Sequence, residues 1–251
     1  MHVAVVSSIL PATNYSHYLI SGLQALPAEN LFVTPYVDDN IKNRDVDLEN
    51  IELVWSKNPA YLLQIIRQVM KDKPSVVHLQ HEINMFGGPL TAVLFPFLVI
   101  LLRLLGVKVI TTVHAVVPPA QIDKEFMKTF SWPQNKLFVL GGRLALGFIY
   151  TFISLFSSQI IVHTAGIKTT LCDSYFAKRE NVTVIPHGVP DEEQIAGVSE
   201  IKQKWARKVS GRRIILNFGY IVRRKGLEYL INAFELLIKE HKDYSLIIAG
   251  G

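Results

Sequence analysis

Short runs of apolar residues alternate along the chain with longer stretches in which apolar residues recur at helical spacing. The short runs are rich in β-branched residues and are bounded by glycine, proline or polar residues, so we expect them to form strands. Strands are predicted at residues 2–7, 31–37, 51–55, 75–79, 107–113, 159–163 and 182–185. Helices are predicted at residues 15–26, 59–71, 89–105, 123–130, 137–156 and 165–176. Because near-continuous apolar strands separated by helices form a parallel sheet covered on both faces, the pattern predicts a Rossmann-like α/β layer.

The same alternation begins again after a polar, charged stretch, with a strand predicted at 214–218, a helix at 226–240 and a strand at 244–249. These divisions predict an N-terminal domain over 1–188, a linker over 189–211 and the start of a second Rossmann-like domain over 212–251. A unit of two strands and one helix is too small to bury its own sheet. We therefore expect the sequence to be part of a longer protein; alternatively, this unit packs on the first domain or on a partner.

Two apolar stretches, at 90–105 and 137–157, raise the question of a membrane. A spanning helix needs roughly 20 apolar residues, and an arginine near its centre is costly. The first stretch is short and contains Pro96 and Arg103, whereas the second contains Arg143 and three glycines. We expect buried or membrane-apposed helices, with true spans as the alternative.

Composition excludes some functional classes. Of 251 residues, 49% are hydrophobic and 19% are charged, which excludes a disordered chain. The formal charge of +5 attracts anions, but no run of lysine and arginine is interleaved with aromatic residues, so we expect no nucleic acid partner. The single cysteine, Cys172, cannot form an internal disulfide, and the first apolar run is too short for a signal sequence. We therefore expect a cytoplasmic location.

Polar residues follow the strand predicted at 75–79, where His81 and Glu82 precede the pair Gly87 and Gly88. Ligands of parallel α/β sheets bind outside the carboxyl ends of the strands. His81 and Glu82 are therefore candidates for hydrogen bonds to sugar hydroxyls or for proton transfer, and the glycines for a close approach to the ligand. Alternatively, the segment is a polar turn whose glycines serve only the backbone geometry.

Three further histidines lie at the ends of predicted strands. His114 is expected at the same sheet edge as His81, either in a functional site or as a structural histidine. His163 precedes Thr164, a suitable helix N-cap, and is expected to support that turn. His78 and His81 suggest a metal site, but strand alternation places them on opposite faces, so we expect no metal.

The loop between the strand at 214–218 and the following helix contains Gly219 and then three consecutive cations, Arg223, Arg224 and Lys225. The N-terminus of a helix carries unpaired N–H groups and the positive end of the dipole, an arrangement that suits a phosphate. Cations at this position oppose the dipole, so they indicate an anionic ligand. A solvated basic turn is the alternative.

Several of these segments together resemble the family 4 glycosyltransferases over nearly the whole chain. The segments are Phe218-Gly219, Lys225-Gly226 with its helix, the crossover at 184–189, residues 78–82 with 86–88, and Thr112-Val113-His114. Their order and spacing carry the resemblance more than any one of them does.

The resemblance implies a GT-B fold, in which two Rossmann-like domains face a cleft. It further implies a nucleotide-sugar donor, retention of anomeric configuration, and no metal or other cofactor. Lys225 would neutralise the leaving diphosphate and His114 would face the transferred sugar. Separately from the resemblance, the two apolar helical stretches and the basic charge lead us to expect an enzyme at the cytoplasmic face of a membrane. Its acceptor would then be a glycan or a lipid-linked molecule in polysaccharide biosynthesis.

The sequence departs from the family at three places. Tyr220 stands where an arginine is usual, and Arg223 or Arg224 is expected to substitute for it. Residues 11–15 replace the usual Gly-Gly loop, and the family's carboxylate pair would lie beyond Gly251. Two rival functions therefore stay open: a catalytically incomplete chain that only binds a glycan or a partner protein, and a GT-B sugar-nucleotide epimerase.

Overall fold

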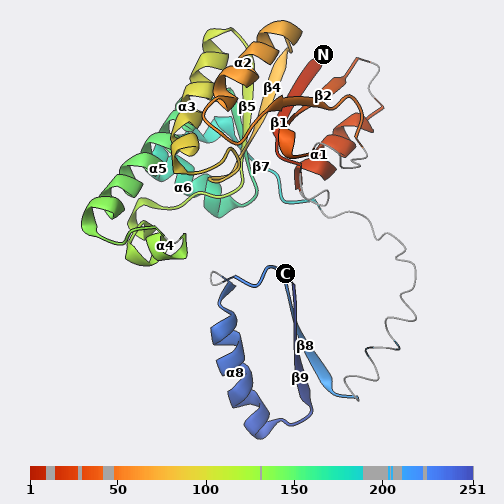
Figure 1. Ribbon diagram of the computed structural model, residues 1–251, viewed down its shortest axis with the longest axis vertical. Coiled ribbons are helices and arrows are strands. Elements are labelled where there is room, and N and C mark those ends of the chain that lie inside the picture. Colours follow the sequence, from red (N-terminus) through yellow and green to blue (C-terminus); the bar gives the residue numbers. More distant parts are fainter. Residues whose placement is uncertain are drawn as a thin grey trace. The chain divides into compact units, whose positions relative to one another are not determined.

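The computed structural model divides the chain into two compact units, Met1–Val189 and Pro190–Gly251 (Figure 1). The structure describes residues 1–9, 15–27, 30–41, 48–130, 132–188, 203, 205, 211–222 and 225–250. Most of the linker predicted at 189–211 lies outside these residues, and the predicted domain limits stay a prediction. Each unit is described by itself.

The first unit is built on one seven-stranded parallel sheet with the order β3-β2-β1-β4-β5-β6-β7. The strands are β1 (His2–Ser7), β2 (Phe32–Asp38), β3 (Glu52–Trp55), β4 (Val76–His81), β5 (Lys108–Val113), β6 (Gln159–Val162) and β7 (Val182–Val184). The strand order reverses between β1 and β4, and in such sheets ligands bind beyond the carboxyl ends of the strands at this switch point. The predicted Rossmann-like layer is confirmed.

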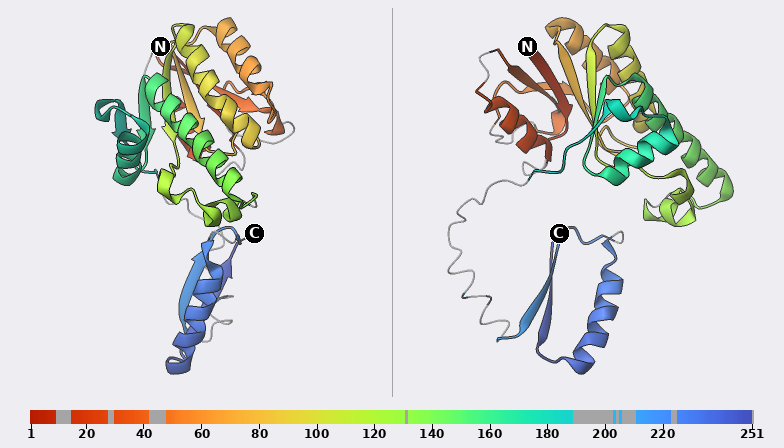
Figure 2. Two further views of the ribbon diagram at one scale, coloured as in Figure 1. Left: turned by 90° about the vertical axis from the view of Figure 1, so that its left-hand side faces the viewer. Right: turned by 180° about the vertical axis from the view of Figure 1, so that it is seen from behind.

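Helices cover both faces of this sheet. They are α1 (Tyr15–Gln24), α2 (Tyr61–Asp72), α3 (Pro89–Leu104), α4 (Lys124–Thr129), α5 (Lys136–Phe156) and α6 (Ala165–Tyr175). Figure 2 shows α2, α3 and α5 side by side on one face, and their buried residues join one core cluster. A second cluster, which includes Ile20 of α1, lies on the other face. Thr164 caps α6 by accepting from the backbone N–H of Ile167, as its sequence position predicts.

The two core clusters fix the direction of each β4 side chain. Val77 and Leu79 belong to the cluster with α2, α3 and α5, whereas Val76 belongs to the cluster with α1. Because side chains alternate along a strand, His78 lies on the α1 face and His81 lies on the α3 and α5 face. The prediction that these two histidines occupy opposite faces is confirmed.

The second unit contains a parallel pair of strands, β8 (Arg213–Phe218) and β9 (Tyr244–Ala249), with the helix α8 (Leu227–Glu240) between them in the chain. None of its described residues is buried. Phe218 is 84% exposed, because one helix covers only part of a two-stranded sheet. Its elements match the predicted ones within one residue.

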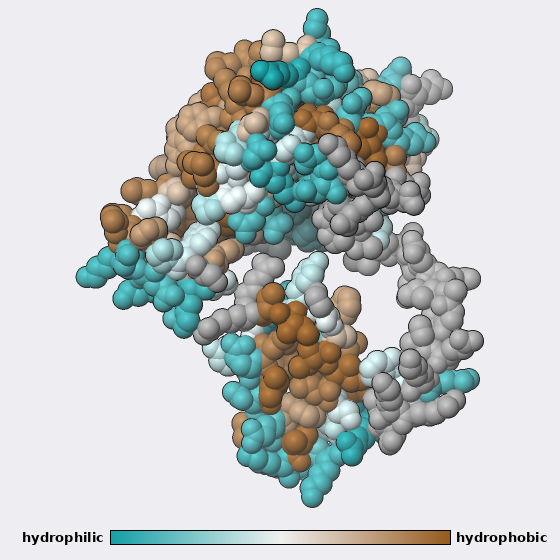
Figure 3. Space-filling view, in the orientation of Figure 1, coloured by the Kyte–Doolittle hydropathy of each residue, from teal (hydrophilic) through white to brown (hydrophobic). Residues whose placement is uncertain are grey.

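The helix α5 is long and apolar enough to cross a membrane by length and composition alone. A core helix of a water-soluble protein would pass the same test, but only 28% of the most apolar window of α5 is buried. Figure 3 shows apolar side chains gathered over α3 and α5 on the left of that view. The helix α5 therefore has one side packed against the protein and one side exposed, as a membrane-apposed helix would have.

Candidate functional site

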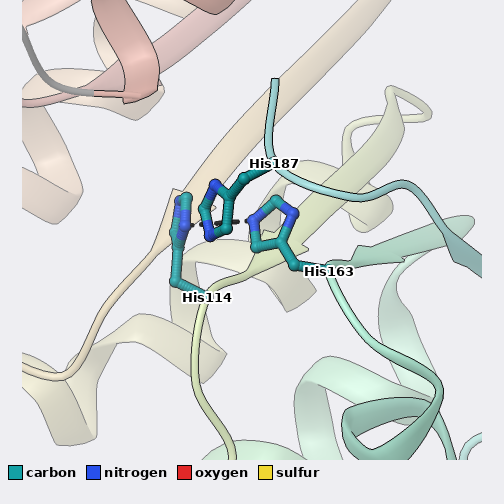
Figure 4. A group of neighbouring side chains, drawn as sticks. All are labelled: His114, His163 and His187. Carbon is teal, nitrogen blue, oxygen red and sulfur yellow. Dashed lines mark hydrogen bonds between the residues drawn. The ribbon is translucent and has the colours of Figure 1, made fainter. Parts of the chain in front are cut away.

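Three histidines from three different segments converge at the carboxyl edge of the sheet (Figure 4). His114 follows β5, His163 follows β6, and His187 lies in the segment after β7. One ring nitrogen of each lies within 4.8 Å of those of the other two. The parallel sheet causes this convergence, because all its strands deliver their carboxyl ends to the same edge. We call these three residues the histidine cluster.

Hydrogen bonds tie two rings of the cluster together and anchor them at both ends. His163 Nδ1 lies 2.9 Å from the carbonyl oxygen of Ile185, and His163 Nε2 lies 3.2 Å from His114 Nδ1. His114 Nε2 lies 2.9 Å from Oε1 of Gln80, which is fully buried. A carbonyl oxygen only accepts, so His163 Nδ1 carries a proton, and in a neutral ring Nε2 is then an acceptor. It follows that His114 Nδ1–H donates to His163 Nε2.

The amide of Gln80 continues this series of hydrogen bonds to His78. His78 Nε2 lies 3.1 Å from Gln80 Nε2 and 2.8 Å from Thr112 Oγ1. If His114 and His163 are both neutral, the amide must present its NH2 group to His114 and its oxygen to His78. With the amide oxygen facing His114, one of the two rings must carry a second proton. Since a glutamine amide is oriented from its hydrogen bonds, the charge of the cluster and the orientation of Gln80 are linked.

The surroundings of His114, His78 and His187 favour the neutral form of these three rings. Burial first, and then the neighbouring rings of His163 and His187, lower the pKa of His114 to about 4. Burial lowers the pKa of His78 to about 4 as well. The pKa of His187 is also lowered, by partial burial and by His163. When His163 is neutral as well, the Gln80 NH2 group faces His114 and the Gln80 oxygen faces His78.

Tyr15, the first residue of α1, joins the cluster from the other side of the β1–β4 switch point. Its ring meets those of His114, His163 and His187 edge-on, with centroids 4.9, 5.0 and 5.1 Å away. The rings of His163 and His187 stack with centroids 3.7 Å apart. Because His187 is itself exposed, the cluster has one face open to solvent.

The arrangement of the cluster is compatible with a transition metal. Imidazole nitrogens suit zinc, copper, iron and nickel, and a second-ring N–H held by a carbonyl oxygen is typical of a metal-bound histidine. His163 has such a partner in Ile185. His78 and His81, which strand alternation separates, do not belong to this group of three residues. The expectation of a metal-free protein stays a prediction.

The structure corrects the interpretation of His81. Its side chain is only 2% exposed and packs against Phe95 and Tyr150, with ring centroids 4.7 and 6.0 Å away. Burial, followed by His114, lowers its pKa to about 3, and its Nδ1 has no hydrogen-bond partner among the residues that the structure describes. His81 therefore belongs to the packed face under α3 and α5, and its side chain does not reach a ligand at the surface. Its carbonyl oxygen accepts from the backbone N–H of His114.

The other predicted acceptor-side residues surround the turn before α3. Glu82 and Gly88 are exposed, so both are accessible to a ligand. Gly87 has φ +127°, and an added Cβ would lie 3.1 Å from the carbonyl oxygen of Lys57. The backbone conformation alone thus accounts for this glycine.

In the second unit, Gly219 ends β8 with φ +140°, and Lys225 is exposed two residues before α8 begins. Gly226 has φ +65° and occupies the N-cap of α8. Arg223 and Arg224 lie outside the described residues. The exposed lysine beside a helix N-terminus keeps the features from which a phosphate site was predicted.

A parallel sheet with a switch point and a polar cluster at its carboxyl edge defines a Rossmann-like ligand-binding protein. A family model described as Glycosyltransferase Family 4 matches residues 12–193. The chain belongs to this family.

One curated relative and two solved structures are also similar to this chain. The uncharacterized glycosyltransferase MJ1607 of Methanocaldococcus jannaschii is 29% identical over 103 residues, which cover 38% of this chain and 25% of that protein. The crystal structure of Anabaena Alr3699/HepE in complex with UDP-glucose matches 99% of this chain with a TM-score of 0.60 at 12% identity. The N-terminal domain of trehalose-6-phosphate phosphatase from Candida albicans matches all of it with a TM-score of 0.64 at 12% identity.

These similarities identify the fold as Rossmann-like GT-B. The chain spans about 60% of the length of the Anabaena structure and 64% of the Candida one. Sequence reasoning found His114 but missed Gln80, Tyr15 and His187 as its neighbours.

Proposed function

We propose that this chain belongs to a glycosyltransferase that moves a sugar from a nucleotide-sugar donor to a glycan or lipid-linked acceptor, with retention of configuration. The observation that carries the proposal is the histidine cluster at the carboxyl edge of the sheet in a family 4 fold. The chain includes the acceptor-side unit and a β-α-β unit with the predicted phosphate-binding loop.

His114 is the proposed catalytic residue, facing the transferred sugar. Glycosyl transfer, like glycoside hydrolysis, passes through a state in which the sugar ring carries positive charge. A neutral imidazole tolerates this charge, whereas an imidazolium would repel it. The low pKa of His114 keeps the ring neutral, and its bonds to His163 and Gln80 hold it in one orientation.

The donor diphosphate is assigned to the loop before α8, with Gly219, Arg223, Arg224 and Lys225 as its contacts. Negative charge develops on the diphosphate as the sugar leaves, and a cation at a helix N-terminus stabilises it. The Anabaena protein of similar fold is described in complex with UDP-glucose and with UDP. A nucleoside diphosphate sugar is therefore the donor class to test first.

The acceptor is placed at the turn before α3, where Glu82 and Gly88 are exposed and Gly87 shapes the backbone. The exposed apolar side of α5, together with the net charge of +5, supports peripheral contact with an anionic membrane at its cytoplasmic face. Polysaccharide or glycolipid synthesis would supply such an acceptor.

Donor binding tests the proposal directly. Calorimetric titration of the protein with UDP-, GDP- and ADP-sugars should find at least one that binds, and Lys225→Ala should weaken it by roughly tenfold or more. Lys242→Ala, which removes another exposed lysine from the same unit, should leave binding unchanged. Equal affinity of wild type and Lys225→Ala would exclude the phosphate role.

The rival function is binding without catalysis, which the absence of buried residues among the described part of the second unit favours. Release of nucleoside diphosphate by this chain with an acceptor present would exclude it. An epimerase would convert the nucleotide sugar with no acceptor present, so product analysis with donor alone separates that reading from transfer.

A further inference from the structure

A cavity of about 500 Å³ lies among α3, α4 and α5 on the face of the sheet opposite α1. One wall is α5, where Gly141 and Ala145 line it, and another is Ala92 near the start of α3. These small side chains leave the space between the helices empty. The volume lies within the range of roughly 300–1,000 Å³ found for ligand pockets.

The cavity reaches the edge of the sheet that carries the functional site. Ile83, which lines it, lies only two residues after the end of β4. A ligand that filled the cavity would therefore have one end near the turn that carries Glu82. This position connects the cavity with the proposed acceptor side.

The walls of the cavity exclude polar ligands. Of the fourteen residues that line it, only Trp132 carries a polar side-chain atom. A sugar or a peptide would bring hydroxyl or amide groups that find no partner there, and unpaired buried polar groups are costly. A hydrocarbon chain brings none, so the lining selects for it.

The charges around the cavity indicate an anionic head group. Lys128, Lys136 and Arg143 each adjoin a lining residue in the chain. Lys128 forms a 3.8 Å ion pair with Glu125, but in the described part of the chain Lys136 and Arg143 have no ion-pair partner. Arg143 is held by a 2.8 Å hydrogen bond from its Nε to the carbonyl oxygen of Ile122. Two uncompensated cations beside an apolar cavity suit a phosphate attached to a hydrocarbon chain.

We infer that this cavity binds one hydrocarbon chain of an anionic lipid, with the head group at the carboxyl edge of the sheet. The assignment of that lipid as the sugar acceptor rests on the proposed function. Leu137 and Leu144 of α5 are 75% and 66% exposed. They would give the hydrocarbon chain an apolar path from a membrane to the cavity.

Single-chain alkyl phosphates, used below the concentrations at which they form micelles, test the binding step without any sugar transfer. From octyl to hexadecyl, affinity should rise about fourfold for each added methylene and then level off when the cavity is full. A dodecyl phosphate brominated near its chain end should quench Trp132, and Trp132→Phe should abolish that part of the quenching. Dodecanol should bind more weakly than dodecyl phosphate, with a difference that salt reduces.

The chain offers a matched pair of variants for this experiment. Gly141 lines the cavity and Gly147 does not, yet both lie in α5. At either position an added Cβ would have no atom of the described part of the chain within 4 Å, the backbone of α5 itself aside. Gly141→Leu should therefore fold, fill part of the cavity and weaken binding of long chains by roughly tenfold. Gly147→Leu should bind as wild type does. Affinity that rises without limit with chain length, or that is equal in the two variants, would overturn the inference.

This experiment tests the lipid cavity separately from sugar transfer. If Gly141→Leu weakens the binding of alkyl phosphates, the inference of a lipid cavity holds even if no nucleotide sugar binds. If a nucleotide sugar binds and alkyl phosphates do not, the inference of a lipid cavity is wrong and the transferase proposal is unaffected.

Discussion

The side-chain amide of Gln80 lies 2.9 Å from His114 Nε2, and the orientation of this one buried amide is linked to the charge of the His114 and His163 rings. The same amide reaches His78 on the other side. Thus a strand residue that would not itself contact a sugar determines how the proposed catalytic ring is presented.

Replacing Gln80 with leucine should destabilise the first unit. Leucine has a similar size but leaves His114 Nε2 and His78 Nε2 with one fewer partner each, a loss of about 1–3 kcal/mol. Denaturant unfolding would measure this loss. Gln134→Leu, at an exposed position, should change stability by less than about 0.5 kcal/mol. Equal stability of the two variants would show that the Gln80 amide is not a structural link.

The low pKa of His114 makes the stability of the protein depend on pH. The pKa of His114 is about 4 in the folded protein and 6.5 in an ordinary setting, so the unfolded chain binds the extra proton more readily. Stability from this residue is therefore complete above pH 6.5 and falls toward pH 4, by up to about 1.4 kcal/mol per pH unit. An NMR titration of the His114 ring measures the pKa directly. A midpoint near pH 6.5 would contradict a His114 ring that is neutral at neutral pH.

Alanine substitutions at the adjacent glycines Gly87 and Gly88 test which of the two is required by the backbone conformation. Gly87→Ala should destabilise the protein by about 1–3 kcal/mol, because φ is +127° and the new Cβ would lie 3.1 Å from the carbonyl oxygen of Lys57. At Gly88 an added Cβ would have no atom of the described residues within 4 Å, and φ is −91°, so Gly88→Ala should change the stability of the protein little. Thermal unfolding of both variants measures the difference. If Gly88→Ala were the less stable one, the assigned turn geometry would be wrong.

The exposed side of α5 should determine membrane contact. Leu144→Glu adds a negative charge at a position that is 66% exposed, and it should lower binding to anionic vesicles by about tenfold or more. Leu63→Glu, at a position 55% exposed on α2, is the matched control and should bind nearly as wild type does. Sedimentation with vesicles at low salt measures both. No binding of wild type under these conditions would exclude the membrane contact.

The order and limits of the elements could be predicted because their signals are local. Apolar runs such as the one in β5 and N-caps such as Thr164 depend on a few neighbouring residues. Every predicted strand and helix in the described residues lies within two residues of its predicted limits. The position of His114 at the sheet edge could be predicted for the same reason, since His114 directly follows β5.

The rest of the site depends on contacts between distant segments. His187 stacks on His163 only because β7 pairs with β6 and returns the chain to the same edge. No local pattern marks that contact. Gln80 did offer a signal, namely a polar residue inside an apolar strand with His78 on the same face. The prediction for His81 was wrong. Its position at the end of a strand suggested an exposed side chain, but strand alternation directs that side chain into the core.

The central claim is that the histidine cluster serves sugar transfer, and transfer by a His114→Ala variant tests it most directly. Release of nucleoside diphosphate from the nucleotide sugar that binds would be followed with membrane lipid as acceptor, for wild type and variant. We predict that wild type releases it and that the variant does so roughly 100-fold more slowly with unchanged donor affinity. Equal rates for the two proteins, or no release by wild type with any bound donor, would contradict the claim.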